Sequence, residues 1–514
     1  MVETKWTETG TPHARAHRAL ATWASGLAAS AVIALAGFLA TPWLVRWLGD
    51  APWGAWTVIG EWLGYLGLTQ LAMGPGALTI FLLRARLQGE PTALTAIAKR
   101  GAQIYIFAAL GLTPVAIGLS WWAPLWLHLP ATLLTSLRWA TAIASLGSIA
   151  IAFSVVFRGV LETVQRGYLV RGALLLQSLT ITGLSLLWVW MGWGIVGMAA
   201  ANVCGLVAGA GMWIWWARRW LPKWGGTAAA PLSAATLWTY NWPLLLAMLG
   251  NQVNQMTDNT VVGLRLGAGA VAAFALTQSL PLLASAQLTE IGAVSWAALG
   301  ELRQRDPKAF GERVVELAST VLGVGAILMV TLGSFNRAFV DLWVGPRHFD
   351  GSLLTWATVA SVVVFSWLCF FGWLIDTQGD SRKRVMASSI GSAINLGLSL
   401  FLVGKLGVAG VALGTVIAYL LTDAWFLPRI AIRHYQVPRT ALLRAVGAAL
   451  LRAALWAGVW LEATRYLTPA ASWAGLILEL ALAGGLAAAY CWAWMLRPAD
   501  RQAWRQRWAG LWAR

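Results

Sequence analysis

The sequence predicts an all-α polytopic membrane protein with about 14 transmembrane helices, arranged as two six-helix lobes in a parallel internal repeat plus two extra C-terminal helices. Three observations predict this class. Of the 514 residues, 59% are hydrophobic and only 11% are charged, whereas soluble domains carry about 25% charged residues. The apolar residues form runs near the roughly 20 residues that cross a bilayer as a helix. Finally, the two halves of the chain resemble each other.

Fourteen apolar runs, separated by charged loops, mark the expected helices. Helices are required because lipid offers no hydrogen-bond partner to an open sheet edge. In chain order the runs cover residues 19–42, 54–83, 102–122, 139–157, 172–191, 195–216, 236–264, 270–296, 314–335, 352–375, 385–404, 406–428, 445–463 and 471–496.

The positions of the 37 Lys and Arg residues predict the orientation of these helices. Most of them lie in the N-terminal segment and in the loops that follow even-numbered runs. By the positive-inside rule, both termini are therefore cytoplasmic. The net charge of +17 then fits anionic lipid headgroups, and nucleic acid is not expected as a partner. The three cysteines lie far apart inside apolar runs, so neither a disulfide nor a metal site is expected.

An internal repeat relates the two halves. Six helices return the chain to its starting side, so the halves have the same orientation, with a binding site expected between them. This is the organisation of an alternating-access transporter. The matching segments are FRGVLETVQ (157–165) with FFGWLIDTQ (370–378) and GIVGMA (194–199) with GVAGVA (407–412), both at an offset of 213, and LGDAPWGAW (48–56) with LGAGAVAAF (266–274), at an offset of 218.

The runs and the repeat together predict seven parts of the chain. They are a cytoplasmic N-terminus (1–18), an N-lobe with helices 1–6 (19–216), a cytoplasmic linker (217–235), a C-lobe with helices 7–12 (236–428), a cytoplasmic loop (429–444), helices 13 and 14 (445–496) and a basic amphipathic C-terminal segment (497–514).

Four segments carry a resemblance to a known family: WLVRWLGDAPWGAW (43–56), FRGVLETVQRGYLVR (157–171), DNTVVGLRLGAGAVAAFAL (258–276) and WLIDTQGDSRKR (373–384). They resemble the bacterial polysaccharide transporters, the O-antigen-type lipid-linked oligosaccharide flippases of the multidrug/oligosaccharidyl-lipid/polysaccharide exporter superfamily. The resemblance extends over about residues 19–435. Fourteen helices are similar to the lipid II flippase branch, and by this analogy helices 13 and 14 cover a groove for a prenyl tail.

The resemblance implies a function and a location. It implies a flippase that moves an undecaprenyl-pyrophosphate-linked glycan from the inner to the outer leaflet of the bacterial cytoplasmic (inner) membrane, for surface polysaccharide biosynthesis. Membrane lipids and the polysaccharide polymerase machinery are the implied partners.

Helix 7 carries a polar stripe. Asn251, Asn254, Gln255 and Asp258 follow the i, i+3, i+4, i+7 pattern, and Arg265 lies on the same face one heptad later. Because such a stripe is costly against lipid, it is predicted to line the cavity between the lobes. The alternative is that these side chains only form hydrogen bonds between helices.

Charged residues on other helices complete the predicted site. Arg46, at the end of helix 1, and Arg265 are the cations expected to bind pyrophosphate, since the guanidinium fork pairs with phosphate oxygens bidentately. An interfacial anchor is an equally weighted role for Arg46. Glu61 is a further cavity residue. Glu61, Asp258 and Glu290 are candidates for coupling transport to a proton or sodium gradient, and no bound cofactor is expected.

Helix 11 presents Ser388, Ser392, Asn395 and Ser399 on one face, a pattern typical of close helix packing. Asp423 and Glu479 receive no role. No G-x-x-x-x-G-K-[ST] loop, metal-ligand spacing or nucleophile motif is present, so an enzyme is not expected. The alternative function is a multidrug/cation antiporter of the same superfamily. Arg265 and helices 13 and 14 favour the anionic lipid-linked cargo over the organic cation of such an antiporter.

Overall fold

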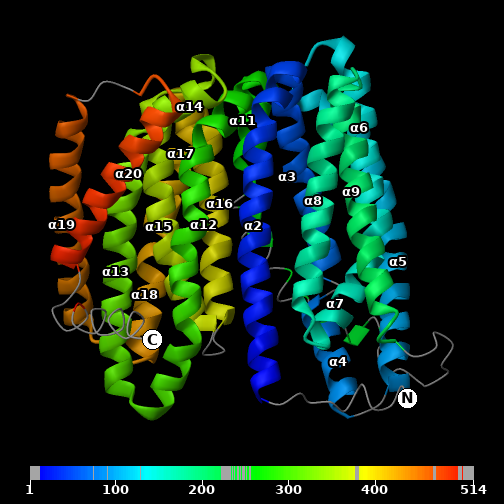
Figure 1. Cartoon of the computed structure of the whole chain (residues 1–514), viewed down its shortest axis with the longest axis horizontal. Coiled ribbons are helices and arrows are strands. Elements are labelled where there is room, and N and C mark those ends of the chain that lie inside the picture. Colours follow the sequence, from blue (N-terminus) through cyan, green and yellow to red (C-terminus); the bar gives the residue numbers. More distant parts are fainter. Residues whose placement is uncertain are drawn as a thin grey trace. The chain divides into compact units, whose positions relative to one another are not determined.

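A computed structural model describes residues 12–72, 75–88, 91–127, 129–221, 256–376, 381–466 and 470–495, together with Arg501 and isolated residues between 233 and 253. In these ranges every regular element is a helix, and none is a strand. Within each part of the chain the long helices pack side by side (Figure 1).

The helices of the first half are α2 (Pro12–Leu48), α3 (Asp50–Ala72), α4 (Pro75–Leu87), α5 (Pro91–Trp122), η1 (Ala123–Leu127), α6 (Ala131–Ile151), η2 (Ala152–Ser154), α7 (Val155–Thr163), α8 (Gly167–Trp190) and α9 (Gly194–Ala217). Those of the second half are α11 (Asp258–Leu266), α12 (Ala268–Arg305), α13 (Pro307–Ser334), α14 (Asn336–Trp343), η3 (Pro346–His348), α15 (Ser352–Asp376), α16 (Ser381–Leu406), α17 (Val408–Leu421), α18 (Asp423–His434), α19 (Arg439–Thr464), α20 (Trp473–Tyr490) and the π-helical η4 (Cys491–Met495).

Twelve helical segments among the described residues are long and apolar enough to cross a membrane. The predicted all-α polytopic class is therefore confirmed. The predicted count of fourteen is not confirmed, since the runs 54–83 and 236–264 are not among the twelve. Both runs cross residues outside the described part of the chain. Within them, α3 and α4 cover most of the first run, and α11 covers the end of the second.

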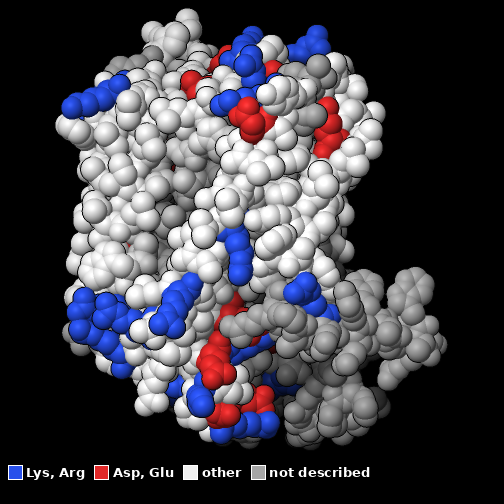
Figure 2. Space-filling view, turned by 90° about the vertical axis from the view of Figure 1, so that its left-hand side faces the viewer, with Lys and Arg blue, Asp and Glu red and all other residues white. Residues whose placement is uncertain are grey.

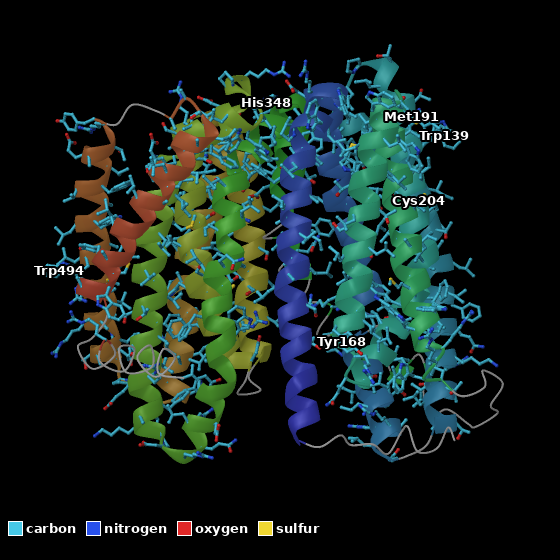
Figure 3. The ribbon with its side chains drawn as sticks, in the orientation of Figure 1. Trp139, Tyr168, Met191, Cys204, His348 and Trp494 are labelled. Atoms are coloured by element: carbon cyan, nitrogen blue, oxygen red, sulfur yellow. The ribbon has the colours of Figure 1, made fainter. Side chains whose placement is uncertain are left out.

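The surface agrees with a lipid environment. Large apolar side chains such as Trp139, Met191 and Trp494 are more than half exposed, and Figure 3 labels them. Figure 2 shows charged side chains gathered toward the top and the bottom of one face, with mostly uncharged surface between them. An apolar surface of this extent marks a contact with lipid or protein.

The chain divides into two compact units. The first unit contains residues 1–252 and 266–272, and the second contains 253–265 and 273–514. Each unit has a buried core of its own, around Leu82 and Tyr105 in the first unit and around Phe310 and Phe371 in the second. The lobe limits drawn from the sequence remain a prediction.

Glycines at equivalent positions give the two halves the same turns. Gly49 and Gly267 have φ of 86° and 87°, and each directly precedes a helix, α3 or α12. Gly194 and Gly407 have φ of 55° and 60° at the starts of α9 and α17. This left-handed conformation strongly favours glycine. The pairs are separated by the offsets of 218 and 213 found in the sequence.

Buried side chains follow the same correspondence. Phe157 and Leu161 belong to the core of the first unit, and Phe370 and Leu374 to the core of the second. Each pair is separated by 213 residues. The similar segments FRGVLETVQ and FFGWLIDTQ therefore occupy equivalent places in their own units.

The C-terminal helix α19 is attached to α13 by polar contacts as well as by packing. The indole Nε1 of Trp456 donates to Thr331 Oγ1 at 3.0 Å, and that of Trp460 donates to Ser334 Oγ at 3.0 Å. The two indole rings are stacked, with centroids 5.6 Å apart. Hydrogen bonds between helices stabilise packing in lipid, where apolar contact alone gives little preference for protein over lipid.

Helices α16 and α17 pack at backbone contact. A Cβ atom at Gly410 of α17 would overlap the carbonyl group of Leu402 on α16. One turn later, a Cβ at Gly414 would lie 2.8 Å from the hydroxyl of Ser399. The lack of side chains at these glycines therefore sets the distance between the two helices.

We expect Gly410→Ala to lower the free energy of unfolding by about 1–3 kcal/mol, because the added methyl group forces the two backbones apart. The matched control is Gly404→Ala on α16, where a Cβ meets no atom within 4 Å. Thermal unfolding of both variants in detergent tests this. Equal midpoints for the two variants would contradict it.

Candidate functional site

Oxygen atoms from three helices gather in the second unit. The hydroxyl of Thr415 on α17 lies 3.4 Å from Asp258 Oδ2, 3.1 Å from Asn395 Oδ1 and 3.3 Å from the Val411 carbonyl. The hydroxyl of Ser399 lies 3.2 Å from Asn395 Oδ1 and 3.3 Å from the Val411 carbonyl. We call these five residues of α11, α16 and α17 the oxygen cluster.

Local structure explains the position of each group. Asp258 is the first residue of α11, and the positive end of a helix dipole favours a carboxylate there. Asn395 and Ser399 are four residues apart on α16 and therefore share a face. Gly414 lets α17 approach that face closely, which brings the Thr415 hydroxyl within reach of the carboxylate.

The oxygen cluster is rich in acceptors, and it is buried except for Asp258, which is half-buried. Asn395 and Ser399 are 1% exposed and Thr415 is 6% exposed. Its two hydroxyl protons face three acceptors, namely the carboxylate of Asp258, the amide oxygen of Asn395 and the carbonyl of Val411. Carboxylate, hydroxyl and carbonyl oxygens are ligands for hard cations, and the same groups can hold a proton.

The equivalent positions of the first unit lack the carboxylate. Ala40 occupies the position of the acid and Leu186 that of the serine, and both pack in an apolar cluster with Met198. Thr182 and Asn202 occupy the positions of the amide and the threonine. Of these two sets of equivalent residues, only the set in the second unit contains a charged side chain that can bind a cation.

The sequence found part of the oxygen cluster. Asp258 was predicted as a coupling residue, and that role remains a prediction. Asn395 and Ser399 were assigned to helix packing, and the structure shows that both contact α17. Asn395 shares the Thr415 hydroxyl with the Asp258 carboxylate. Thr415 was not singled out. Its position four residues after Val411, on the helix directly following α16, is the signal that could have found it.

Glu61 lies on α3 in the first unit and is 3% exposed. Three residues later, Gly64 leaves room for the side-chain amide of Gln252, which a Cβ at that position would overlap. Residues three apart share a helix face. The Gln252 side chain therefore approaches α3 on the face that carries Glu61.

The roles of the other predicted site residues remain predictions. Arg46 in the last turn of α2 and Arg265 in the last turn of α11 are both exposed. Asn251, Asn254 and Gln255 lie outside the described residues. Glu290 belongs to α12, but its side chain lies outside the described part.

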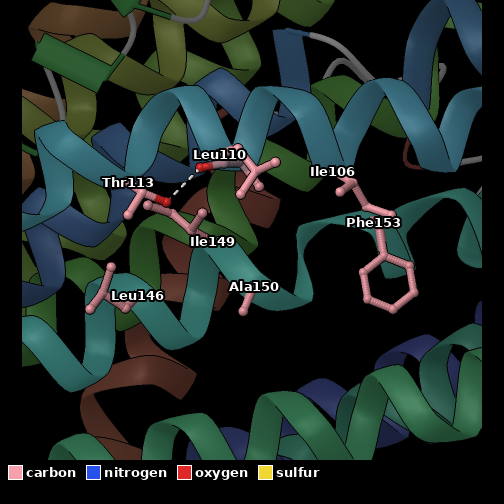
Figure 4. A pocket seen from close by; sticks show the side chains of 8 residues that line it. Ile106, Leu110, Thr113, Leu146, Ile149, Ala150 and Phe153 are labelled. Carbon is pink, nitrogen blue, oxygen red and sulfur yellow. Dashed lines mark hydrogen bonds between the residues drawn. The ribbon is translucent and has the colours of Figure 1, made fainter.

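Described residues of the first unit line two of its cavities. One, of about 320 Å³, lies between α5 and α6 (Figure 4) and is lined by Ile106, Ala109, Leu110, Thr113, Leu146, Ile149, Ala150 and Phe153. The Thr113 hydroxyl donates to the Ala109 carbonyl at 3.0 Å, so the walls present mainly apolar surface, suited to a hydrocarbon chain. The other, of about 260 Å³, includes Ser148, Gln177 and Trp213. The buried indole N–H of Trp213 has no acceptor among the described residues.

Comparison with known families identifies the family of the chain. The family model described as "Polysaccharide biosynthesis protein" matches residues 19–296, which is more than half of the chain. The chain belongs to the polysaccharide biosynthesis protein family. The resemblance noted in the sequence motifs is thereby confirmed. No curated protein sequence matches the chain.

Solved structures show the fold of this family member. The chain is similar to the lipid II flippase MurJ in an inward closed conformation, with a TM-score of 0.66, 14% identity, and coverage of 92% of this chain and 99% of that one. An inward-facing MATE family multidrug transporter matches with a TM-score of 0.60, 14% identity and coverage of 82% and 95%. A MOP superfamily transporter from Pyrococcus furiosus matches with a TM-score of 0.56, 14% identity and coverage of 87% and 97%. The protein thus has the fold of MOP superfamily transporters.

We expect a cation to stabilise this polysaccharide biosynthesis family member through the oxygen cluster. Replacing choline by Na⁺ at 100 times the dissociation constant should add about 2.7 kcal/mol to the free energy of unfolding. Asp258→Asn should abolish the effect and Thr415→Val should weaken it. Thermal unfolding in detergent provides the measurement.

Glu301→Gln serves as the control, because Glu301 forms an exposed ion pair with Arg305 on α12, away from the cluster. Stabilisation that depends on pH and Asp258, with no response to Na⁺, would assign the cluster to a proton. An undiminished Na⁺ response in Asp258→Asn would place the cation elsewhere.

Proposed function

We propose that the protein is a flippase that moves an undecaprenyl-pyrophosphate-linked oligosaccharide from the inner to the outer leaflet of the bacterial cytoplasmic membrane. Transport proceeds by alternating access and serves surface polysaccharide biosynthesis. A single cation bound at the oxygen cluster couples the cycle to a sodium or proton gradient. Both termini lie in the cytoplasm, and the polysaccharide polymerase machinery is the downstream partner.

The family match carries this proposal. It connects more than half of the chain to polysaccharide biosynthesis, while the fold is that of transporters. A protein with both properties fits the step at which a membrane-bound precursor must cross the bilayer. The likeness to a lipid II flippase extends over 92% of the chain, which includes residues beyond the matched family region. Both observations favour a lipid-linked cargo.

A multidrug antiporter is the competing function, because MATE family transporters share the fold. An organic cation would require an anionic cavity, whereas a pyrophosphate requires cations. The exposed Arg265 at the end of α11 is seven residues from the oxygen cluster acid Asp258. An arginine so close in sequence to the proposed coupling site favours the anionic cargo.

Cells that lack the protein should accumulate the lipid-linked repeat unit on the inner leaflet and lose surface polysaccharide. Extraction of undecaprenyl-linked intermediates, with accessibility of the glycan to an added periplasmic enzyme, measures both. Unchanged glycan together with new sensitivity to cationic dyes would instead identify the antiporter.

Arg265→Ala should abolish glycan export while leaving membrane insertion and thermal unfolding unchanged, because the variant loses the phosphate-binding cation. Arg265→Lys should retain part of the activity, since the charge remains but the planar fork is lost. Arg337→Ala is the control: Arg337 is an exposed arginine of the same unit that faces Asp341 at 3.8 Å. Normal export by Arg265→Ala would move the cargo site away from α11.

A further inference from the structure

One arginine lies in the middle of a membrane-crossing helix. The uncharged stretch 445–461 of α19 is interrupted only by Arg452. With a rise of 1.5 Å per residue, Arg452 lies about 20 Å from the start of α19 and about 18 Å from its end. A helix of this length, centred on a hydrocarbon core about 30 Å thick, places Arg452 inside that core.

The nearest charged residues of α19 lie far from Arg452 along the helix axis. Arg444 lies eight residues earlier, about 12 Å along the axis, and Glu462 lies ten residues later, about 15 Å. Glu462 is occupied with Arg465 at 2.8 Å near the end of the helix. A long arginine side chain can extend toward the membrane interface. From this position, however, the Arg452 side chain would have to span most of the distance from the middle of α19 to one of its ends.

The described part of the protein offers no partner to the Arg452 guanidinium. Among the described residues, Arg452 forms a hydrogen bond through its backbone, where its carbonyl accepts from Tyr490 Oη at 2.9 Å. The residue is half-buried, whereas its neighbours Leu451 and Leu455 are 63% and 58% exposed. The guanidinium thus borders an apolar surface that faces the surroundings.

Aromatic contacts hold α19 against α20 and η4 near Arg452. The ring of Tyr490 lies 5.0 Å from that of Trp456 and 6.5 Å from that of Trp494, measured between centroids. Directly after Tyr490 the chain changes from α-helix to the π-helical η4, and π-helical turns are frequent at functional sites. Figure 3 labels Trp494, which is 63% exposed.

A charge in this position requires an anion, because an unpaired guanidinium in hydrocarbon is costly. The bilayer itself supplies one strong anionic group, the phosphate of a lipid, and arginine binds phosphate bidentately. We propose that Arg452 is a binding site for a lipid phosphate that enters from the bilayer beside α19. The site belongs to the second unit alone, and it does not depend on the proposed cargo.

The experiment uses the full-length protein in detergent, with lipid retention followed by native mass spectrometry. The probes are undecaprenyl phosphate, phosphatidylglycerol and the uncharged diacylglycerol. Arg452→Gln should retain the two phosphate-bearing lipids about tenfold more weakly than the unmodified protein, because the charge-assisted pair is lost. Arg452→Lys should retain these lipids more strongly than Arg452→Gln and more weakly than the unmodified protein, since it keeps the charge but loses the planar fork.

Arg444→Gln is the matched control, an exposed arginine of the same helix, and it should retain lipid as the unmodified protein does. Stronger retention of undecaprenyl phosphate than of phosphatidylglycerol would support a prenyl phosphate as the source, and equal retention would support a bilayer phospholipid. Unchanged retention in Arg452→Gln, or equal retention of diacylglycerol, would overturn the proposal.

A second measurement avoids variants that fail to fold. A photoactivatable undecaprenyl phosphate or phosphatidylglycerol, with the reactive group next to the phosphate, is added to the unmodified protein. Peptide mapping should find the label within one or two turns of Arg452. Label confined to other helices would overturn the proposal, whatever the behaviour of the substituted proteins.

Discussion

The absence of water in the bilayer is the constraint on which the rest of the structure depends. A polar group at that depth must find its hydrogen bond within the protein. Most hydroxyls do so locally: Thr41, Ser120 and Thr141 donate to the carbonyl one turn earlier at 2.8, 2.6 and 2.8 Å. Such residues are satisfied by their own helix. The informative polar residues are therefore those that a single helix cannot satisfy, as in the oxygen cluster and at Arg452.

Hydropathy was sufficient to predict the fold class, and the resemblance of four segments to a known family predicted the family. The glycine pairs Gly49 with Gly267 and Gly194 with Gly407 could be aligned because left-handed turns admit few other residues. The prediction that Ser399 lies on a packing face agrees with the close approach of Gly414 on α17. Along one helix the spacing of Ser399 is that of a packing face, and its second role appears only when α17 approaches through Gly410 and Gly414. The contact between two helices cannot be predicted from the residue spacing along either helix alone.

Helices α19 and α20 combine two kinds of surface. Toward α13, the indoles of Trp456 and Trp460 are buried and bonded to hydroxyls. Away from it, Leu451, Leu455 and Trp494 remain exposed. Interhelical hydrogen bonds thus fix the inner face, while the outer face is left to contact lipid. A helix pair attached in this way can differ in lipid preference from the rest of the molecule without changing the core to which it is bound.

The unequal halves have a consequence for the energetics of transport. The acid of the oxygen cluster has Ala40 as its counterpart in the first unit, where the neighbouring side chains are apolar. If the cluster holds the coupling ion, as proposed, its counterpart among the described residues of the first unit adds no second charged site of the same kind, and the cluster contributes one ion per cycle. An ion that crosses a potential of 100 mV provides about 2.3 kcal/mol. That amount is the electrical work that one ion bound at the oxygen cluster contributes to each turnover, and the buried Glu61 of the first unit would add to it only by binding an ion of its own.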